Sequence, residues 1–202
     1  AARSEPFHVD RTRPYLRCPR CRLVYVPARW HVSADDARKR YDLHQNRPDD
    51  PRYREFLRRL VDPLAARLPP GAQGLDFGSG PGPTLSLLFS EKGFPMANYD
   101  PFYANDPSLL ETRYDFVTCT ETVEHFTRPR QDWEQLVRLA KPGGWIGVMT
   151  ERLEDGRDFG RWRYANDTTH VGFYSKRTLE WVADTHHLKA DFVAPTVVLF
   201  RT

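Results

Sequence analysis

Apolar residues along the chain follow two different spacings, which alternate from segment to segment after about residue 74. Short continuous apolar runs predict buried strands at 74–77, 96–99, 115–120 and 145–150. Apolar residues that recur every three or four positions predict helices at 84–92, 131–140 and 176–185. Two last runs predict a terminal strand pair at 190–193 and 196–200. Strands that alternate with helices indicate an α/β fold whose mostly parallel sheet is covered on both faces.

The stretch between Asp100 and Asp115 is too short for a full helix and strand, so we expect one strand unit of the sheet to be shortened. The predicted fold class is therefore Rossmann-like α/β, with a mostly parallel sheet, helices on both faces and an antiparallel strand pair at the end. Residues 71–202 are predicted to form this domain, and residues 1–70 to form a small N-terminal cap.

The predicted cap combines irregular chain, a short strand and helices. Residues 1–13 show no periodic pattern and are expected to be irregular, whereas 23–26 has the composition of a strand. A helix that begins with a capping serine is predicted at 33–43. From 53 to 68 the apolar residues fall on one helix face, and Pro63 is expected to kink this helix or to start a second one.

Three glycines, Gly78, Gly80 and Gly82, separate the first strand of the main domain from the helix that follows. Glycine at such a bend lets the chain turn tightly and lets a ligand approach where a Cβ would block it. Asp100 ends the next strand, 22 residues after Gly78, where a carboxylate can accept hydrogen bonds from both hydroxyls of a ribose. The glycine spacing and the two prolines in the turn leave few amide donors for a pyrophosphate, which disfavours a nicotinamide dinucleotide.

Four motifs follow one another along this domain: LDFGSGPG at 75–82, YD at 99–100, DFVTCTETVEHF at 115–126 and LAKPGGWIGVMT at 139–150. Together they resemble the successive motifs of class I S-adenosylmethionine-dependent methyltransferases, and the resemblance extends from about Gly74 to Phe200. Within that class, the chain resembles a bacterial group that carries an N-terminal Cys-x-x-Cys. The resemblance implies that S-adenosylmethionine is the cofactor and that its methyl group is transferred to an acceptor.

The resemblance also implies roles for the residues at the motif positions. Residues at the glycine turn would line the methionine part of the cofactor: Asp76, Gly78, Ser79 and Gly80. Asp100 would hold the ribose, and Phe102 with the Asn105–Asp106 pair would approach the adenine. Thr120 and Glu121, directly after the third strand, would border the sulfonium. Turn packing, a structural turn carboxylate and core packing are the alternative explanations for these residues.

Three histidines are candidates for a general base, which methyl transfer to a hydroxyl or an ammonium group requires. His170 is the first candidate, because it follows the strand at 145–150 and lies beside Asp167, which could orient its ring. His44, at the end of the helix at 33–43, is second, and His125 is third. A structural hydrogen bond between His170 and Asp167 is the alternative for the first, and a place at a helix start is the alternative for His125.

The cysteine pair Cys18 and Cys21 has the spacing of half a zinc site. Zinc requires four ligands, and His8 and His31, which flank the pair, could complete a Cys2His2 site. The alternative is a pair that binds no metal. The third cysteine, Cys119, lies in a predicted buried strand, and an odd, low count argues against a disulfide framework.

Charge is distributed unevenly along the 202 residues, although the net charge is only +3. Residues 1–67 hold 16 Lys and Arg against 9 Asp and Glu, a balance of +7, and the remainder holds 14 against 18, a balance of −4. The basic segment 1–67 could contact nucleic acid or an anionic substrate, or it could simply be solvated. No apolar run approaches the roughly 18 residues of a membrane span, and no signal core is visible, so a cytoplasmic protein without membrane contact is expected.

These observations predict methyl transfer from S-adenosylmethionine to a small-molecule acceptor, because the chain has no room for a large substrate domain. Residues 1–67 are then expected to act as a lid over the acceptor site. Two alternatives remain open: a nucleic-acid methyltransferase that uses the basic segment, and a cofactor-binding module without activity. The sequence leaves the oligomeric state, the acceptor and the methylated atom undetermined.

Overall fold

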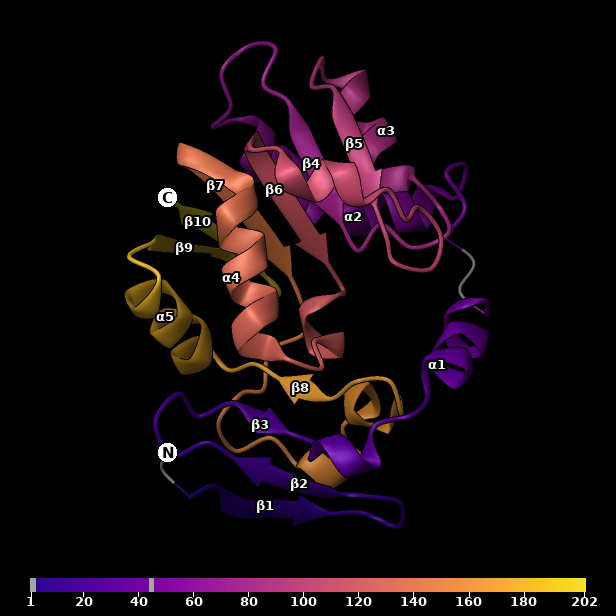
Figure 1. Cartoon of the computed structure of the whole chain (residues 1–202), viewed down its shortest axis with the longest axis vertical. Coiled ribbons are helices and arrows are strands. Elements are labelled where there is room, and N and C mark those ends of the chain that lie inside the picture. The colour runs from indigo at the N-terminus through magenta and orange to yellow at the C-terminus, as the bar shows by residue number, and fades with distance from the viewer. Residues whose placement is uncertain (1–2, 44–45) are drawn as a thin grey trace.

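The computed structural model of the chain describes residues 3–43 and 46–202. Its main sheet has six strands in the order β5-β4-β6-β7-β10-β9 (Figure 1). Four of them are parallel: β4 (Gly74–Phe77), β5 (Met96–Tyr99), β6 (Tyr114–Thr120) and β7 (Ala140–Met149). The last two are antiparallel: β9 (Lys189–Ala194) and β10 (Val197–Arg201). The predicted fold class is confirmed, including the antiparallel strand pair at the end of the chain.

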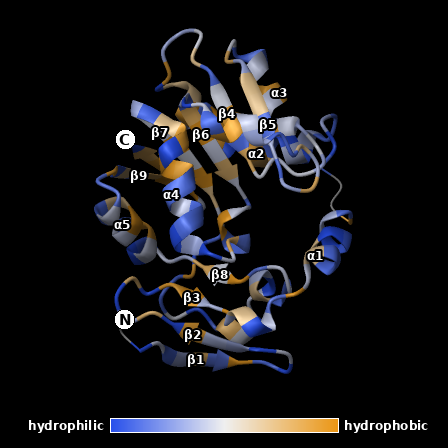
Figure 2. Ribbon diagram, viewed as in Figure 1, coloured by the Kyte–Doolittle hydropathy of each residue, from blue (hydrophilic) through white to orange (hydrophobic). Residues whose placement is uncertain are grey.

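Helices cover both faces of this sheet, α2 (Pro51–Ala65) and α3 (Thr84–Glu91) on one face and α4 (Pro129–Leu139) and α5 (Lys176–Thr185) on the other (Figure 1). Successive side chains of a strand point to opposite faces, so Phe116 packs with α2 and α3 while its neighbour Val117 packs with α4 and α5. Figure 2 shows the apolar residues of the strands enclosed between these helices.

The connection between β5 and β6 contains a short 3-10 helix, η2 (Pro107–Glu111), and no further strand. This confirms the expected shortening of one strand unit and leaves β5 at the edge of the sheet. Four other 3-10 helices interrupt the loops: η1 (Ala28–Trp30), η3 (Val123–His125), η4 (Phe159–Arg161) and η5 (Arg163–Asn166). None of the helices in the described part of the chain is long and apolar enough to cross a membrane.

A second, four-stranded sheet has the order β1-β2-β3-β8, formed by β1 (Glu5–Val9), β2 (Pro14–Arg17), β3 (Val24–Tyr25) and β8 (Gly172–Phe173). The expectation that the first 13 residues are irregular is wrong for Glu5–Val9, because β1 pairs with β2. Tyr15, Val24 and Phe173 build the core of this sheet with Phe159 and Trp162 from the loop that follows β7.

The N-terminal segment and the main domain exchange elements across the predicted boundary at residue 70. β8 belongs to the C-terminal half of the chain but completes the N-terminal sheet by pairing with β3. Conversely, α2 precedes the boundary, but its buried face packs on the main sheet, and the helix runs through Pro63 as a single element. The short helix α1 (Ala34–Tyr41), capped by Ser33, stands apart from both cores (Figures 1 and 2).

Arg13 joins the N-terminal sheet to the loop that carries His170. Its side chain is buried, and its guanidinium donates hydrogen bonds to the carbonyl oxygens of Ala165, Asp167 and Thr168 and to the Tyr15 hydroxyl. The fixed fork of guanidinium donors allows one side chain to satisfy three backbone carbonyls at once.

Replacing Arg13 by alanine is therefore expected to lower the free energy of unfolding by about 3 kcal/mol or more, because each buried carbonyl left without a donor costs about 1–3 kcal/mol. Urea unfolding followed by circular dichroism measures the change. Arg11→Ala is the matched control, since Arg11 is exposed in the same β1–β2 turn and should change the value by no more than about 0.5 kcal/mol. Equal stability of the two variants would show that Arg13 does not tie the loop to the sheet.

Candidate active site

The glycine turn after β4 has the geometry that its sequence predicts. Gly78 and Gly80 have φ angles of 83° and 64°, in the left-handed region that favours glycine. A Cβ at Gly78 would lie 2.3 Å from Cγ2 of Thr122, which also donates a hydrogen bond to the Gly78 carbonyl oxygen. The turn is thus packed directly against the segment that follows β6.

Asp100 ties this turn to the loop after β5. Its Oδ2 accepts a hydrogen bond from the Gly80 amide at 2.9 Å, and its Oδ1 accepts from the amides of Phe102 and Tyr103. A carboxylate has about four acceptor positions, so these three amides leave room on Oδ2 for a hydroxyl donor. The sequence predicts that Asp100 accepts hydrogen bonds from two ribose hydroxyls. With all three amide hydrogen bonds kept, its carboxylate has one acceptor position left for such a hydroxyl.

Asp76 is a buried carboxyl group at the end of β4. Burial raises its pKa to about 7, the charge of Asp100 acts in the same direction, and a hydrogen bond from the Thr118 hydroxyl at 2.7 Å opposes the rise. Tyr53 of α2 lies near this group. Burial raises the pKa of the tyrosine, and the charges of Asp76 and Glu121 act in the same direction. Sequence reasoning missed Tyr53, since it reads as part of the apolar face of its helix.

The segment after β6 connects the glycine turn to a second polar group. Glu121 adopts a φ of 47°, unusual for a residue other than glycine, and its amide donates to the Met149 carbonyl oxygen at the end of β7. Burial and the charge of Glu124 raise the pKa of Glu121 well above its usual range. Backbone strain of this kind is often found where a site requires a particular side-chain direction.

Glu124 is fully buried behind this segment. Its Oε2 accepts a hydrogen bond from the Thr150 hydroxyl at 3.0 Å, and the Tyr164 hydroxyl lies 2.8 Å from the same Thr150 oxygen. Its backbone carbonyl accepts from the Val171 amide next to β8. Glu124 therefore links the ends of β6 and β7 to the N-terminal sheet.

Two of the three predicted histidines lie beside Glu124, with their ring centroids 4.8 Å apart. Nδ1 of His125 is 3.0 Å from the Thr169 carbonyl oxygen and 3.2 Å from the Tyr41 hydroxyl. Nδ1 of His170 is 2.7 Å from the Tyr164 carbonyl oxygen. The third candidate, His44, lies outside the described residues, as does Gln45.

The expected partnership between His170 and the Asp167 side chain is wrong. The Asp167 carboxylate instead accepts hydrogen bonds from Thr169 and from the Arg40 guanidinium. Burial lowers the pKa of His170 to about 4, opposed by the charge of Glu124 and assisted by that of His125. A pKa of about 4 leaves the His170 ring neutral at pH 7.

Residues of the N-terminal segment lie over the glycine turn and over the group formed by Glu124, His125 and His170. The Tyr41 ring contacts the rings of Phe102 and His125, and the Tyr103 hydroxyl donates to Asp42 at 2.6 Å. Asn46 lies against the glycine turn, where a Cβ added to Gly82 would be 2.2 Å from its carbonyl oxygen. In the sequence, Tyr41 and Asn46 are indicated only by the place of their segment at the end of one predicted helix and before the next. That place is the basis of the expected lid role.

The Cys18 and Cys21 thiols share the turn between β2 and β3, apart from these groups. Burial acts to raise the pKa of each thiol. At Cys18, amide hydrogen bonds from Cys21 and Arg20 outweigh burial, and the pKa is lowered. At Cys21 the effect of burial is larger, and the pKa rises to about 11. In residues 3–43 and 46–202, no third histidine, cysteine or carboxylate lies within ligand distance of the pair. His31 instead bonds the Val26 carbonyl oxygen, so a Cys2His2 site does not form, and zinc at the pair stays a prediction.

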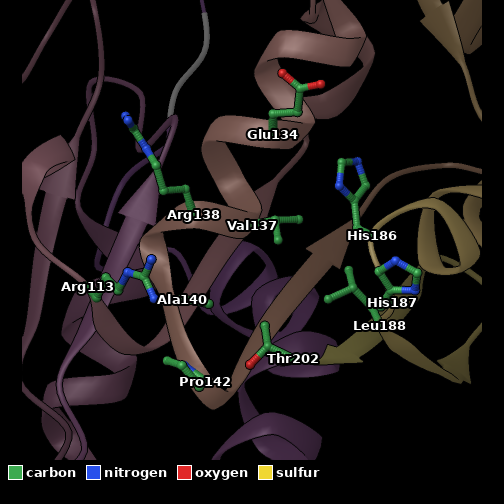
Figure 3. A pocket seen from close by; sticks show the side chains of 10 residues that line it. All are labelled: Arg113, Glu134, Val137, Arg138, Ala140, Pro142, His186, His187, Leu188 and Thr202. Carbon is green, nitrogen blue, oxygen red and sulfur yellow. The ribbon is translucent and has the colours of Figure 1, made fainter.

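A separate hollow of about 460 Å³ lies at the opposite end of the strands of the main sheet (Figure 3). Its lining includes Arg113, which precedes β6, Pro142 in the first part of β7 and Thr202, which follows β10. The amino ends of the parallel strands border this hollow. Ligands of open α/β sheets bind at the carboxyl ends, so the hollow is not the site that the motifs predict.

Comparison with known proteins identifies the fold and the family. A family model described as a methyltransferase domain matches residues 50–190. The ubiquinone biosynthesis O-methyltransferase of Proteus mirabilis is 33% identical over 91 residues, which are 45% of this chain and 37% of the relative. The chain therefore spans little more than a third of the length of this curated relative.

Two solved structures share the fold at low sequence identity. The 1,6-didemethyltoxoflavin-N1-methyltransferase of Burkholderia thailandensis, which holds 1,6-didemethyltoxoflavin and S-adenosylhomocysteine, has a TM-score of 0.57 and 16% identity. That alignment covers 98% of this chain and 99% of the other. A SAM-dependent methyltransferase of Archaeoglobus fulgidus has a TM-score of 0.58 and 14% identity over 74% and 92% of the two chains.

Removing the Asp100 carboxylate should weaken binding of S-adenosylhomocysteine by roughly 10–150-fold, the equivalent of about 1.5–3 kcal/mol for hydrogen bonds to a charged acceptor. Calorimetry on Asp100→Ala measures the change. Asp184→Ala is the control, because Asp184 is an exposed carboxylate of α5, outside the glycine turn and the loop after β5. Unchanged affinity in Asp100→Ala would remove this residue from the site.

The raised pKa of Asp76 predicts a pH-dependent affinity. The ammonium group of the amino-acid part of the cofactor would favour ionised Asp76, and below pH 7 the free protein carries the Asp76 carboxyl mostly protonated. Affinity for S-adenosylhomocysteine should thus rise about tenfold per pH unit up to about pH 7 and then level off. Titrations from pH 5.5 to 8 test this, with Asp76→Asn expected to show a flat profile. A wild-type profile as flat as that of the variant would contradict the assignment.

Proposed function

We propose that this chain, which belongs to the methyltransferase-domain family, transfers the methyl group of S-adenosylmethionine to a hydroxyl oxygen of a small-molecule acceptor. One observation supports this proposal most strongly. The glycine turn with Asp100 and the polar group of Glu124, His125 and His170 share one edge of the sheet, and the segment 120–125 joins them. Donor and acceptor can therefore meet at the carboxyl ends of β4 and β6.

The residues at the glycine turn fit the parts of the cofactor. The methionine part would lie against Asp76, Gly78, Ser79 and Gly80, where the left-handed glycines keep side chains out of the way. Asp100 would accept from a ribose hydroxyl, and Phe102 would face the adenine. Thr120 and Glu121 would border the sulfonium, which supplies an activated methyl group for displacement. The protein then has to hold the acceptor oxygen in line with that group.

The polar group on the far side of segment 120–125 is suited to an acceptor hydroxyl. Burial keeps the His170 ring neutral at pH 7, and both histidines have their Nδ1 atoms engaged with backbone carbonyls. Tyr41 spans from Phe102 to His125, so the N-terminal segment covers donor and acceptor sides together. This arrangement supports a lid role for α1 and the chain that follows it.

The basic residues of segment 1–67 support a small-molecule acceptor over nucleic acid. Many of them are engaged within the molecule: Arg13 with backbone carbonyls, Arg17 with Glu5, Arg40 with Asp167, Arg54 with Glu91 and Arg67 with Asp191. A phosphate-binding surface requires cations that are free to contact the backbone of the nucleic acid. The curated relatives named ubiquinone biosynthesis O-methyltransferase also favour an oxygen acceptor on a small molecule.

Methyl transfer from labelled S-adenosylmethionine tests this function. The protein is incubated with the small-molecule fraction and with the nucleic-acid fraction of a cell extract, and the labelled product is identified by mass spectrometry and by the NMR signal of its methoxy group. Label is expected in the small-molecule fraction with wild type and with Asp184→Ala, and greatly reduced with Asp100→Ala. Label confined to RNA or DNA, or cofactor binding without label in either fraction, would overturn the proposal.

A further inference from the structure

Glu124, His125 and His170 bring one carboxylate oxygen and two ring nitrogens within 4.8 Å of one another. We propose that these three residues bind a divalent transition-metal ion, and that this ion holds the acceptor hydroxyl. The second half of this inference rests on the proposed function, whereas metal binding does not. No other group of three such side chains lies within ligand distance anywhere in residues 3–43 and 46–202.

Hydrogen bonds fix the tautomer of both histidines. A backbone carbonyl can only accept, so Nδ1 of His125 and Nδ1 of His170 must each carry the proton that bonds Thr169 and Tyr164 respectively. In the neutral form of each ring, the lone pair is therefore on Nε2. Histidines that bind metals in proteins commonly donate their other ring N–H to a backbone carbonyl in this way, which orients the ring and raises its basicity.

Glu124 is oriented in the same manner and has an oxygen to spare. Thr150 donates to Oε2, while Oε1 is buried without a hydrogen-bond partner in the described part of the chain. A carboxylate oxygen in a fully buried residue costs free energy unless a proton or a cation satisfies it. All three side chains thus have an orienting partner on one atom and an available lone pair on another.

The donor set indicates which class of metal would bind. Two imidazoles and one carboxylate, with further positions left open, are typical of ions such as Fe²⁺, Co²⁺, Mn²⁺ and Zn²⁺ rather than Ca²⁺. Metal bonds of about 2.0–2.2 Å place two ligand atoms at most roughly 4.4 Å apart, so closing from 4.8 Å requires only a small movement. The open positions would receive the acceptor oxygen.

The proposed role removes the need for a strong base among the side chains. A divalent ion lowers the pKa of a bound water from about 16 to about 7 in favourable cases, and it acts on an alcohol in the same sense. The acceptor hydroxyl would release its proton to solvent, and its oxygen would attack the methyl carbon. The new C–O bond forms as the C–S bond breaks, the sulfonium becomes the neutral thioether of S-adenosylhomocysteine, and one proton is released per turnover.

Titration with Co²⁺ after stripping with a chelator tests the site, in the Cys18→Ser/Cys21→Ser variant so that these thiols do not contribute. Calorimetry and the visible spectrum should report one equivalent of Co²⁺ bound by nitrogen and oxygen ligands. His170→Ala and Glu124→Gln should weaken binding by about 100-fold or more, and Thr150→Val by roughly 10–100-fold, because loss of a supporting partner alone has effects of that size. His186→Ala, in the distant hollow, should bind Co²⁺ normally.

Circular dichroism establishes that each variant is folded, and His170→Ala provides the test if Glu124→Gln is not. Absence of Co²⁺ binding in the parent, or unchanged binding in folded His170→Ala, would overturn the metal site. Methyl transfer that persists after complete chelation would overturn only the role of the metal in catalysis. A bound metal without methyl transfer to any small molecule would instead contradict the proposed function, so the two failures are distinguishable.

Discussion

The burial of the Glu124 carboxylate is the constraint on which the arrangement of this protein depends. Burial of a carboxylate costs free energy, and in the described residues the Glu124 side chain and backbone each accept a hydrogen bond from a different segment while Oε1 is left without a partner. Thr150, directly after β7, donates to it, Tyr164 supports Thr150, and the Val171 amide holds the backbone of the same residue. Glu124 follows β6 by only a few positions, and it thereby fixes where the N-terminal sheet meets the main sheet.

This junction explains why the N-terminal segment is built into the fold rather than attached to it. β8 follows Val171 directly and supplies the fourth strand of the N-terminal sheet, and Arg13 binds the preceding loop through three carbonyls. Tyr41, at the end of α1, contacts Phe102 and His125, and Asn46 lies against the glycine turn. Residues of the N-terminal segment thus lie over both the glycine turn and the group formed by Glu124, His125 and His170.

Sequence reasoning identified what depends on local pattern and missed what depends on distant partners. Alternating apolar runs and helical spacing were sufficient for the main sheet, and Gly78, Gly80 and Asp100 were recognisable because their spacing carries the chemistry. β1 escaped because a short, half-exposed strand has no clear periodicity. The partners of His170 and Glu124 escaped because a backbone carbonyl and a distant hydroxyl leave no signature in the sequence.

We infer that the methyl donor binds at the carboxyl ends of β4, β5 and β6, beside the segment that includes α1. Amide hydrogen exchange with and without S-adenosylhomocysteine tests it most directly, because exchange reports protection segment by segment. The account predicts slower exchange in peptides that cover 76–84, 99–104, 119–126 and the end of α1. Protection confined to the opposite edge, around Arg113 and His186, with these peptides unchanged, would contradict it.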